Sequence, residues 1–225
     1  MSIRRNIEIT CPKCGKAQSF LVYDSVCVSL FSGHKEKELI KQFKFFKHKC
    51  ILCGLNIELS YPCLYHDTKR KLMIWLVPVG IENEQELLDD ILKSRVLDGY
   101  TTRLVASDLE LIDKIEIFDE GLDDRVIEIC KILMYGDICK ADPKYEAYEL
   151  NAATYHKNHG VQHTIMYHST LRGEKATFAL QLSQEYYDNI RKAFSKVLSD
   201  MPCEKYEVVN ENWAYSAVDL FKQQR

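Results

Sequence analysis

Alternating apolar and polar residues mark the first third of the chain as a region of half-buried β-strands. The runs that alternate, or that are rich in β-forming residues, cover residues 3–10, 19–29, 43–49, 55–61 and 72–77. A charged segment at 31–42 interrupts them and predicts a turn followed by a short helix. Tyr65, His66 and Asp67 are expected to form a turn between two strands, because an aspartate side chain readily supports an Asx-turn.

Helical and strand patterns follow one another through the rest of the chain. Apolar residues at helical spacing predict helices at 82–98, 108–118, 119–135, 186–198 and 213–222. Short strands are expected at 101–106 and 207–210. Three further strands at 145–155, 162–168 and 176–182 are separated by turn signals at His159-Gly160 and Arg172-Gly173, which predicts a meander.

Two Cys-x-x-Cys-Gly motifs carry the clearest chemistry, since Cys11, Cys14, Cys50 and Cys53 form two pairs with the same spacing. Zinc prefers four tetrahedral thiolate ligands, and a two-residue spacer lets both sulfurs of one tight turn reach the same ion. We therefore expect one structural zinc ion with no open position for water. The alternative, a redox-active dithiol at Cys11 and Cys14, requires a helix after the motif, whereas a strand is expected there.

These patterns together predict an α+β fold. An N-terminal zinc-ribbon-like antiparallel β-sheet is followed by helices and then by a C-terminal β-meander with helices. A break in composition near Pro143 predicts a soft boundary. Residues 1–135 would form the zinc-ribbon domain with a helical closing segment, and residues 136–225 an α+β C-terminal region.

Charge is distributed unevenly along the chain, although the formal net charge is only −3. Residues 1–80 contain 13 basic and 6 acidic side chains, whereas residues 81–225 contain 17 basic and 27 acidic ones. A basic N-terminal part suits an acidic partner, and a solvated surface is the simpler interpretation. No long apolar run or signal-peptide core is present, so we expect a cytoplasmic protein without membrane association.

Five segments occur in a specific order: Cys11-Pro-Lys-Cys14, Cys50-Ile-Leu-Cys53-Gly54, Tyr61-Pro-Cys-Leu-Tyr-His-Asp67, Lys71-Leu-Met-Ile-Trp-Leu-Val-Pro78 and Ile117-Phe-Asp-Glu-Gly-Leu-Asp-Asp-Arg-Val-Ile-Glu128. In this order they resemble the CpXC domain family over roughly residues 5–135. The chain departs from the family pattern at Ile51, where proline is usual. A proline at this position rigidifies the turn but does not ligate a metal, so its replacement leaves the expected metal site unaffected. The resemblance implies a zinc-ribbon-like fold and no known activity.

A basic segment supplies the candidate nucleic-acid-binding residues Lys41, Lys44, Lys47 and Lys49. Lysines neutralise phosphates, and the neighbouring Phe43, Phe45 and Phe46 suit stacking on bases. The alternative interpretation is that the alternating phenylalanines face a core.

Acidic residues at a helix start, Asp123, Asp124 and Glu128, form a candidate cation or catalytic site. The alternative is helix capping with surface charge pairs, and no other residues predict a catalytic centre. We expect a zinc-stabilised interaction module that binds a protein partner, with a nucleic-acid-binding ribbon as the alternative.

Overall fold

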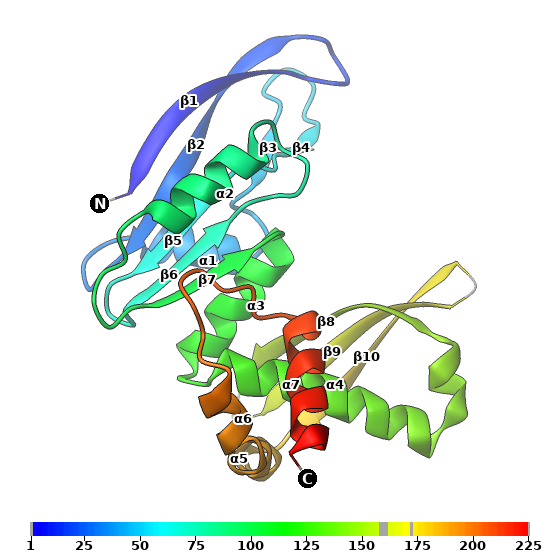
Figure 1. The fold of residues 1–225 in the computed structure, drawn as a ribbon. Helices are drawn as coiled ribbons and strands as arrows, with labels where there is room; N and C mark the ends of the chain where they lie inside the picture. Colours follow the sequence, from blue (N-terminus) through cyan, green and yellow to red (C-terminus); the bar gives the residue numbers. More distant parts are fainter. Residues whose placement is uncertain (1, 158–161, 172, 225) are drawn as a thin grey trace. The chain divides into compact units, whose positions relative to one another are not determined.

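The computed structural model describes residues 2–157, 162–171 and 173–224 (Figure 1). The chain divides into two compact units, Met1–Ile112 with Lys205–Glu207 and Asp113–Glu204 with Val208–Arg225. Each unit contains helices and its own sheet, which confirms the α+β class. The boundary predicted after residue 135 lies inside helix α4 (Asp124–Ala141), and independent folding of 1–135 and 136–225 stays a prediction.

The first unit is built on a five-stranded sheet. Its strands, in spatial order, are β1 (Ile3–Thr10), β2 (Ala17–Val28), β5 (Cys63–Asp67), β6 (Leu72–Leu76) and β7 (Thr101–Val105). The β2–β5 and β6–β7 pairs are parallel, and the other two pairs are antiparallel. The sheet is therefore mixed rather than wholly antiparallel as expected, because long connections carrying helices return the chain in the same direction.

Strand β5 corrects the expectation of a turn at Tyr65, His66 and Asp67. Buried residues alternate with partly exposed ones along the strand, and Tyr65 and Asp67 both face inward. The Asx-type hydrogen bond does exist, since the Asp67 carboxylate accepts from the Arg70 N–H at 3.0 Å, but it begins where the strand ends. In the sequence alone, an aspartate that faces inward and pairs with cations cannot be distinguished from a turn residue.

Two insertions accompany this sheet. Helices α1 (His34–Lys41) and α2 (Glu84–Lys93) lie at two of the predicted positions. A hairpin of β3 (Lys47–Lys49) and β4 (Asn56–Glu58) replaces the longer strands expected at 43–49 and 55–61. The first is shortened because the N–H groups of Lys44 and Phe45 still bond to the Leu39 carbonyl of α1, which holds this segment in a turn.

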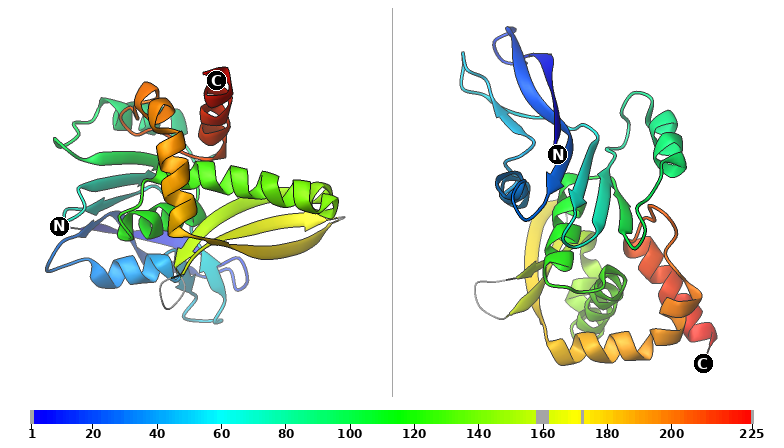
Figure 2. Two further views of the ribbon diagram at one scale, coloured as in Figure 1. Left: turned by 90° about the horizontal axis from the view of Figure 1, so that it is seen from below. Right: turned by 90° about the vertical axis from the view of Figure 1, so that its left-hand side faces the viewer.

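The second unit contains the predicted meander. Strands β8 (Glu149–Lys157), β9 (His163–Leu171) and β10 (Glu174–Leu182) form a sheet in the order β10-β9-β8, and both pairs are antiparallel. His159, Gly160 and Arg172, which belong to the two turn signals, lie outside the described residues. Helix α4 packs beside this sheet (Figure 2) and buries Val126, Ile127 and Cys130 among its tyrosines.

The remaining helices lie before and after α4 in the chain. They are α3 (Asp108–Asp119), which begins in the first unit, the 3-10 helix η1 (Pro143–Ala147), α5 (Gln184–Ala193), α6 (Ser195–Asp200) and α7 (Glu211–Gln223). The helix expected at 186–198 is divided into α5 and α6 at Phe194. The strand expected at 207–210 is reduced to one bridge between Arg103 and Glu207. Among the described helices, none combines the length and apolar character needed to cross a membrane.

Candidate metal centre

Four cysteine sulfurs converge where two hairpins of the first unit meet. Cys11 and Cys14 lie in the turn between β1 and β2, and Cys50 and Cys53 lie in the turn between β3 and β4. All four Sγ atoms lie within 4.8 Å of one another. Sulfurs of different turns approach closely, with Cys11 3.6 Å from Cys53 and Cys14 3.8 Å from Cys50. A tetrahedral ion with metal–sulfur bonds of about 2.3 Å requires sulfur separations of about 3.8 Å, so this donor set fits such an ion.

The two turns repeat the same backbone geometry. In the first, the Cys11 N–H donates to the Lys16 carbonyl at 3.0 Å and the Gly15 N–H donates to the Cys11 carbonyl at 2.9 Å. In the second, the Cys50 N–H donates to the Leu55 carbonyl at 2.8 Å and the Gly54 N–H donates to the Cys50 carbonyl at 2.9 Å. Gly15 and Gly54 both have positive φ angles, 67° and 72°, which glycine adopts without steric cost. Each motif therefore folds locally into a knuckle that aims two sulfurs at one point.

Gln18 on β2 links the two knuckles, and sequence reasoning missed it. Its side chain is buried, its Nε2 donates to Cys50 Sγ at 2.9 Å, and its Oε1 accepts from the Ile51 N–H at 2.9 Å. Gln18 occupies an inward position of β2, two residues before the buried Phe20. The sequence does contain a signal for Gln18, because this polar residue lies on the apolar face of an alternating strand.

The local dipoles favour one ionised sulfur. The backbone N–H of Cys53 and, against the effect of burial, the Gln18 amide lower the pKa of the Cys50 thiol to about 6. Although the Leu55 N–H lowers it, burial and the neighbouring Cys50 sulfur together raise the pKa of Cys53 to about 11. A divalent cation would relieve this repulsion among the sulfurs. The cluster is therefore suited electrostatically, as well as geometrically, to hold a metal ion.

The redox interpretation of the first knuckle has no structural counterpart. A lowered thiol pKa of the thioredoxin type depends on the N-terminus of a helix directly after the motif. In this structure Cys14 is followed by strand β2, and the second knuckle lies against the first.

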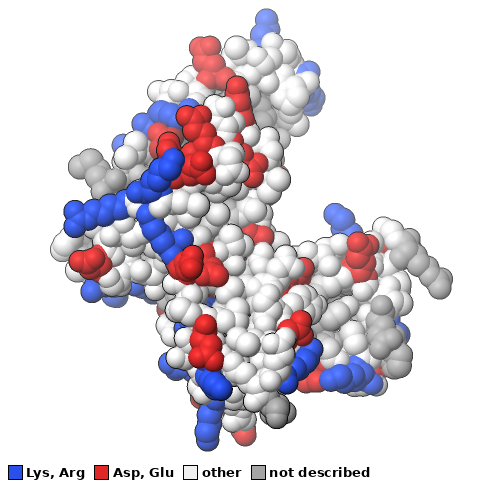
Figure 3. Space-filling model, viewed as in Figure 1, with Lys and Arg blue, Asp and Glu red and all other residues white. Residues whose placement is uncertain are grey.

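The basic segment lies close to the second knuckle. In the first unit (Figure 3) basic side chains are visible at the end that carries the hairpin turns. Three of the four candidate lysines, Lys44, Lys47 and Lys49, are exposed. The fourth, Lys41 on α1, is half-buried. Phe45 and Phe46 are buried, and Phe46 packs edge-on against Tyr61 at 5.3 Å. The structure therefore exposes the lysines and assigns these two phenylalanines to the core.

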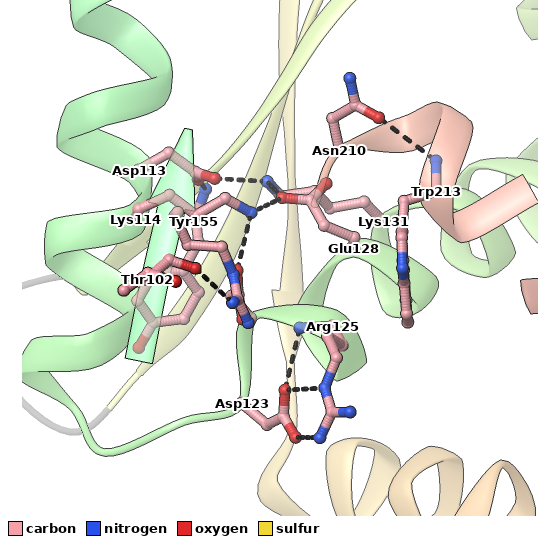
Figure 4. Close-up of polar contacts among 12 residues, drawn as sticks. Thr102, Asp113, Lys114, Asp123, Arg125, Glu128, Lys131, Tyr155, Asn210 and Trp213 are labelled. Carbon is pink, nitrogen blue, oxygen red and sulfur yellow. Dashed lines mark hydrogen bonds and ion pairs between the residues drawn. The ribbon is translucent and has the colours of Figure 1, made fainter. Parts of the chain in front are cut away.

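The three acidic candidate residues Asp123, Asp124 and Glu128 separate into two groups (Figure 4). Asp123 caps α4 by accepting from the Arg125 N–H, and its carboxylate pairs with the Arg125 guanidinium at 2.8 Å. Asp124 and Glu128 are buried and lie 3.3 Å and 2.7 Å from the Lys114 ammonium. The capping interpretation therefore holds for Asp123, whereas the other two carboxylates are not at the surface as that interpretation assumed.

A wider ion network surrounds Glu128 (Figure 4). Lys131 pairs with Glu128 at 3.0 Å and with Asp113 at 2.7 Å, and Asp113 also accepts from the Tyr155 N–H at 2.6 Å. Although burial alone favours a neutral amine, the carboxylates of Glu128 and Asp124 raise the pKa of Lys114 above its usual range. The network joins α3, α4 and β8 through paired charges, which suits a structural role.

Comparison with known protein families gives a match to the part of the chain that contains the candidate metal centre. The model of the CpXC protein family matches residues 9–131, which include all four cysteines and more than half of the sequence. No curated protein and no solved structure matches the chain.

Proposed function

The chain belongs to the CpXC family, and from this premise we propose that it is a zinc-stabilised interaction module that binds a protein partner. One zinc ion would be held by Cys11, Cys14, Cys50 and Cys53. The observation that carries this proposal is the convergence of their four Sγ atoms within 4.8 Å. A complete shell of four thiolates leaves no position for water, so the ion would contribute folding free energy rather than chemistry.

The chemistry of the ligands supports zinc. Thiolates are soft ligands that select zinc, copper(I) or iron, and a closed set of four at single-ion spacing is typical of structural zinc. The ion would join two hairpins that are far apart in sequence. Binding would therefore fix the second knuckle relative to the β1–β2 hairpin.

The second knuckle also presents an apolar surface. Ile51 and Leu52, between the two cysteines of that turn, have 83% and 64% of their surface exposed. Ligation of Cys50 and Cys53 would hold this turn in one conformation, which lowers the entropic cost of binding through it. Exposed apolar residues on a rigid turn are suited to insert into a pocket of a protein partner.

We place the module in the cytoplasm. Metal-binding thiolates, such as those proposed at Cys11, Cys14, Cys50 and Cys53, must remain reduced to function as ligands. A reducing compartment provides that condition.

One observation favours nucleic acid as an alternative partner. Lys47 and Lys49 are two positions apart on β3 and both exposed, so they lie on one face of the strand with Lys44 nearby. Fluorescence anisotropy with single-stranded and double-stranded DNA and RNA tests this alternative. Steeply salt-dependent binding that is lost in Lys47→Gln/Lys49→Gln would support it, and no binding at low salt would remove it.

Metal content and partner capture test the main proposal in sequence. Elemental analysis of protein purified without chelator should give near one zinc per chain. Immobilised wild type should then capture a partner saturably, whereas Ile51→Asp/Leu52→Asp should retain zinc and lose that partner. Val79→Asp is a matched control, because Val79 is 78% exposed and lies in another loop of the first unit. Absence of zinc, or equal capture by all three proteins, would contradict the proposal.

A further inference from the structure

Strand β1 (Ile3–Thr10) forms one edge of the five-stranded sheet (Figure 1). It pairs with β2 on one side, and no other strand in the described part of the chain borders it. The strand has eight residues and no proline, and most of its side chains are exposed. The one shift in its ladder arises from Asp24 on β2, so β1 itself is regular. A long, regular edge offers a row of backbone N–H and C=O groups to another strand.

We propose that β1 pairs with β1 of a second copy of this chain, antiparallel and centred on Asn6, to form a homodimer with one continuous sheet. A twofold axis through the Asn6 pair would close the assembly, so each copy would use the same surface. This inference concerns an edge of the sheet and is independent of the proposed zinc site.

Two of the side-chain pairs that this register opposes are complementary. With Asn6 opposite Asn6, Arg4 faces Glu8 of the second copy, and Ile3 faces Ile9. The twofold axis repeats each pair. Directly opposed side chains of unlike charge, and opposed β-branched side chains, both stabilise antiparallel strands.

Neighbouring registers lack this complementarity. Centring the pair on Arg5 places two arginines opposite each other, which is unfavourable. Centring it on Ile7 places Arg4 opposite Thr10 and Glu8 opposite Asn6, so no unlike charges meet. A shift by a single residue would oppose side chains that belong to different faces of the sheet. Of these registers, only the one centred on Asn6 pairs the charges.

The charges needed for this pairing form no ion pair within the described part of the chain, and the Arg4 guanidinium lies 5.9 Å from the centre of the Tyr23 ring. Arg5 is paired with Asp24 at 2.7 Å, whereas neither Arg4 nor Glu8 has an ion-pair partner among the described residues. Ile3 is 60% exposed and would be partly covered by Ile9 of the second copy. The dimer would therefore give Arg4 and Glu8 an ion-pair partner, and it would shield Ile3, which is exposed in the single chain.

The pairing would leave the proposed partner surface accessible. Asn6 precedes Cys11 by five positions, or about 16 Å of extended strand. The two knuckles of a dimer would lie beyond opposite ends of the paired segment. One strand pair is a small interface, so we expect a reversible equilibrium rather than a permanent dimer.

Charge exchange tests the register in the full chain. Sedimentation of wild type from low micromolar to millimolar concentration should show reversible dimerisation. Arg4→Glu and Glu8→Arg should each weaken association by about tenfold or more, because like charges would then face each other twice. The double variant Arg4→Glu/Glu8→Arg should restore wild-type association. A wild type that stays monomeric throughout, or single variants that associate normally, would overturn the proposal.

A cysteine placed on the twofold axis provides a second test. Opposed Cα atoms in an antiparallel pair are about 4.5–5.5 Å apart, within the range of a disulfide. Asn6→Cys should therefore form a covalent dimer under mild oxidation, beyond any formed by wild type. Ser19→Cys is the matched control, because Ser19 is exposed on β2 and away from the outer edge. Cross-linking of both variants, or of neither, would contradict the register. Zinc content measured on the same samples separates this result from the fate of the metal proposal.

Discussion

The Gln18 side-chain amide donates a hydrogen bond to the Cys50 sulfur at 2.9 Å, from a strand that precedes this cysteine by 32 positions. The same side chain accepts from the Ile51 N–H, so it fixes both the sulfur and the turn that follows it. Donors of this kind orient a ligand sulfur and stabilise its negative charge. Gln18 thus belongs to the candidate metal centre although it ligates nothing.

Substitution of Gln18 should weaken metal binding without abolishing it. Gln18→Leu keeps much of the side-chain volume and removes both hydrogen bonds, so we expect zinc affinity to fall by about 10–100-fold. Competition with a chromophoric chelator measures this change. Gln42→Leu, at an exposed glutamine after α1, is the control and should leave affinity unchanged. Equal affinities for Gln18→Leu and wild type would show that the amide has no part in binding.

Removal of the proposed metal should destabilise the first unit. The small core around the knuckles contains Phe20 and Ile57 together with the cysteines themselves, so it would depend on the proposed ion for much of its stability. Thermal denaturation followed by circular dichroism should show a lower Tm after chelation, and zinc should restore it. Cys50→Ser should behave like the chelated protein, whereas Cys139→Ser, in the last turn of α4, should respond to chelation as wild type does. A Tm that is insensitive to chelator would exclude a structural ion.

Much of the fold could be predicted from the sequence because its elements carry strong local patterns. Alternation predicts β1, a run of β-forming residues predicts β2, and a continuous apolar run predicts β6. A local pattern also predicts α7, and the four cysteines follow from their spacing. Strand β5 was missed because its five residues include a histidine and an aspartate, whose burial is decided by partners elsewhere in the chain. One such partner of Asp67 is Lys37, at 3.7 Å.

The same limit applies to buried polar residues of the candidate sites. Periodicity places Asp124 and Glu128 on a helix, but it cannot show that Lys114 from the preceding helix lies beside them. Gln18 likewise gains its role only when β2 brings it to the second knuckle. Long-range pairing, rather than local propensity, determines these positions.

Stability should decrease at alkaline pH because of two buried thiols. Burial raises the pKa of Cys63 and of Cys130 to about 12, from an ordinary value of 9.0. The unfolded chain would ionise these thiols above about pH 9, whereas the folded chain resists ionisation until about pH 12. The stabilising contribution is therefore present below pH 9 and is lost as the pH rises through this window. Urea denaturation across the window should show a falling free energy of unfolding, and Cys130→Ala should reduce the slope. A slope unchanged by Cys130→Ala would contradict the assignment for that residue.

The buried ion network should respond strongly to loss of one cation. Lys114→Met removes the ammonium that lies 2.7 Å from Glu128 and 3.3 Å from Asp124, and it leaves two buried carboxylates without this partner. Breaking a buried ion pair in this way costs about 3–5 kcal/mol of unfolding free energy. Lys140→Met is the matched control, because Lys140 pairs with Asp137 at the surface and such a pair contributes about 0–1 kcal/mol. Chemical denaturation of both variants measures the difference. A small effect at Lys114 would mean that the carboxylates become protonated or hydrated at little cost, and the acidic helix start would again be a candidate for chemistry rather than for stability.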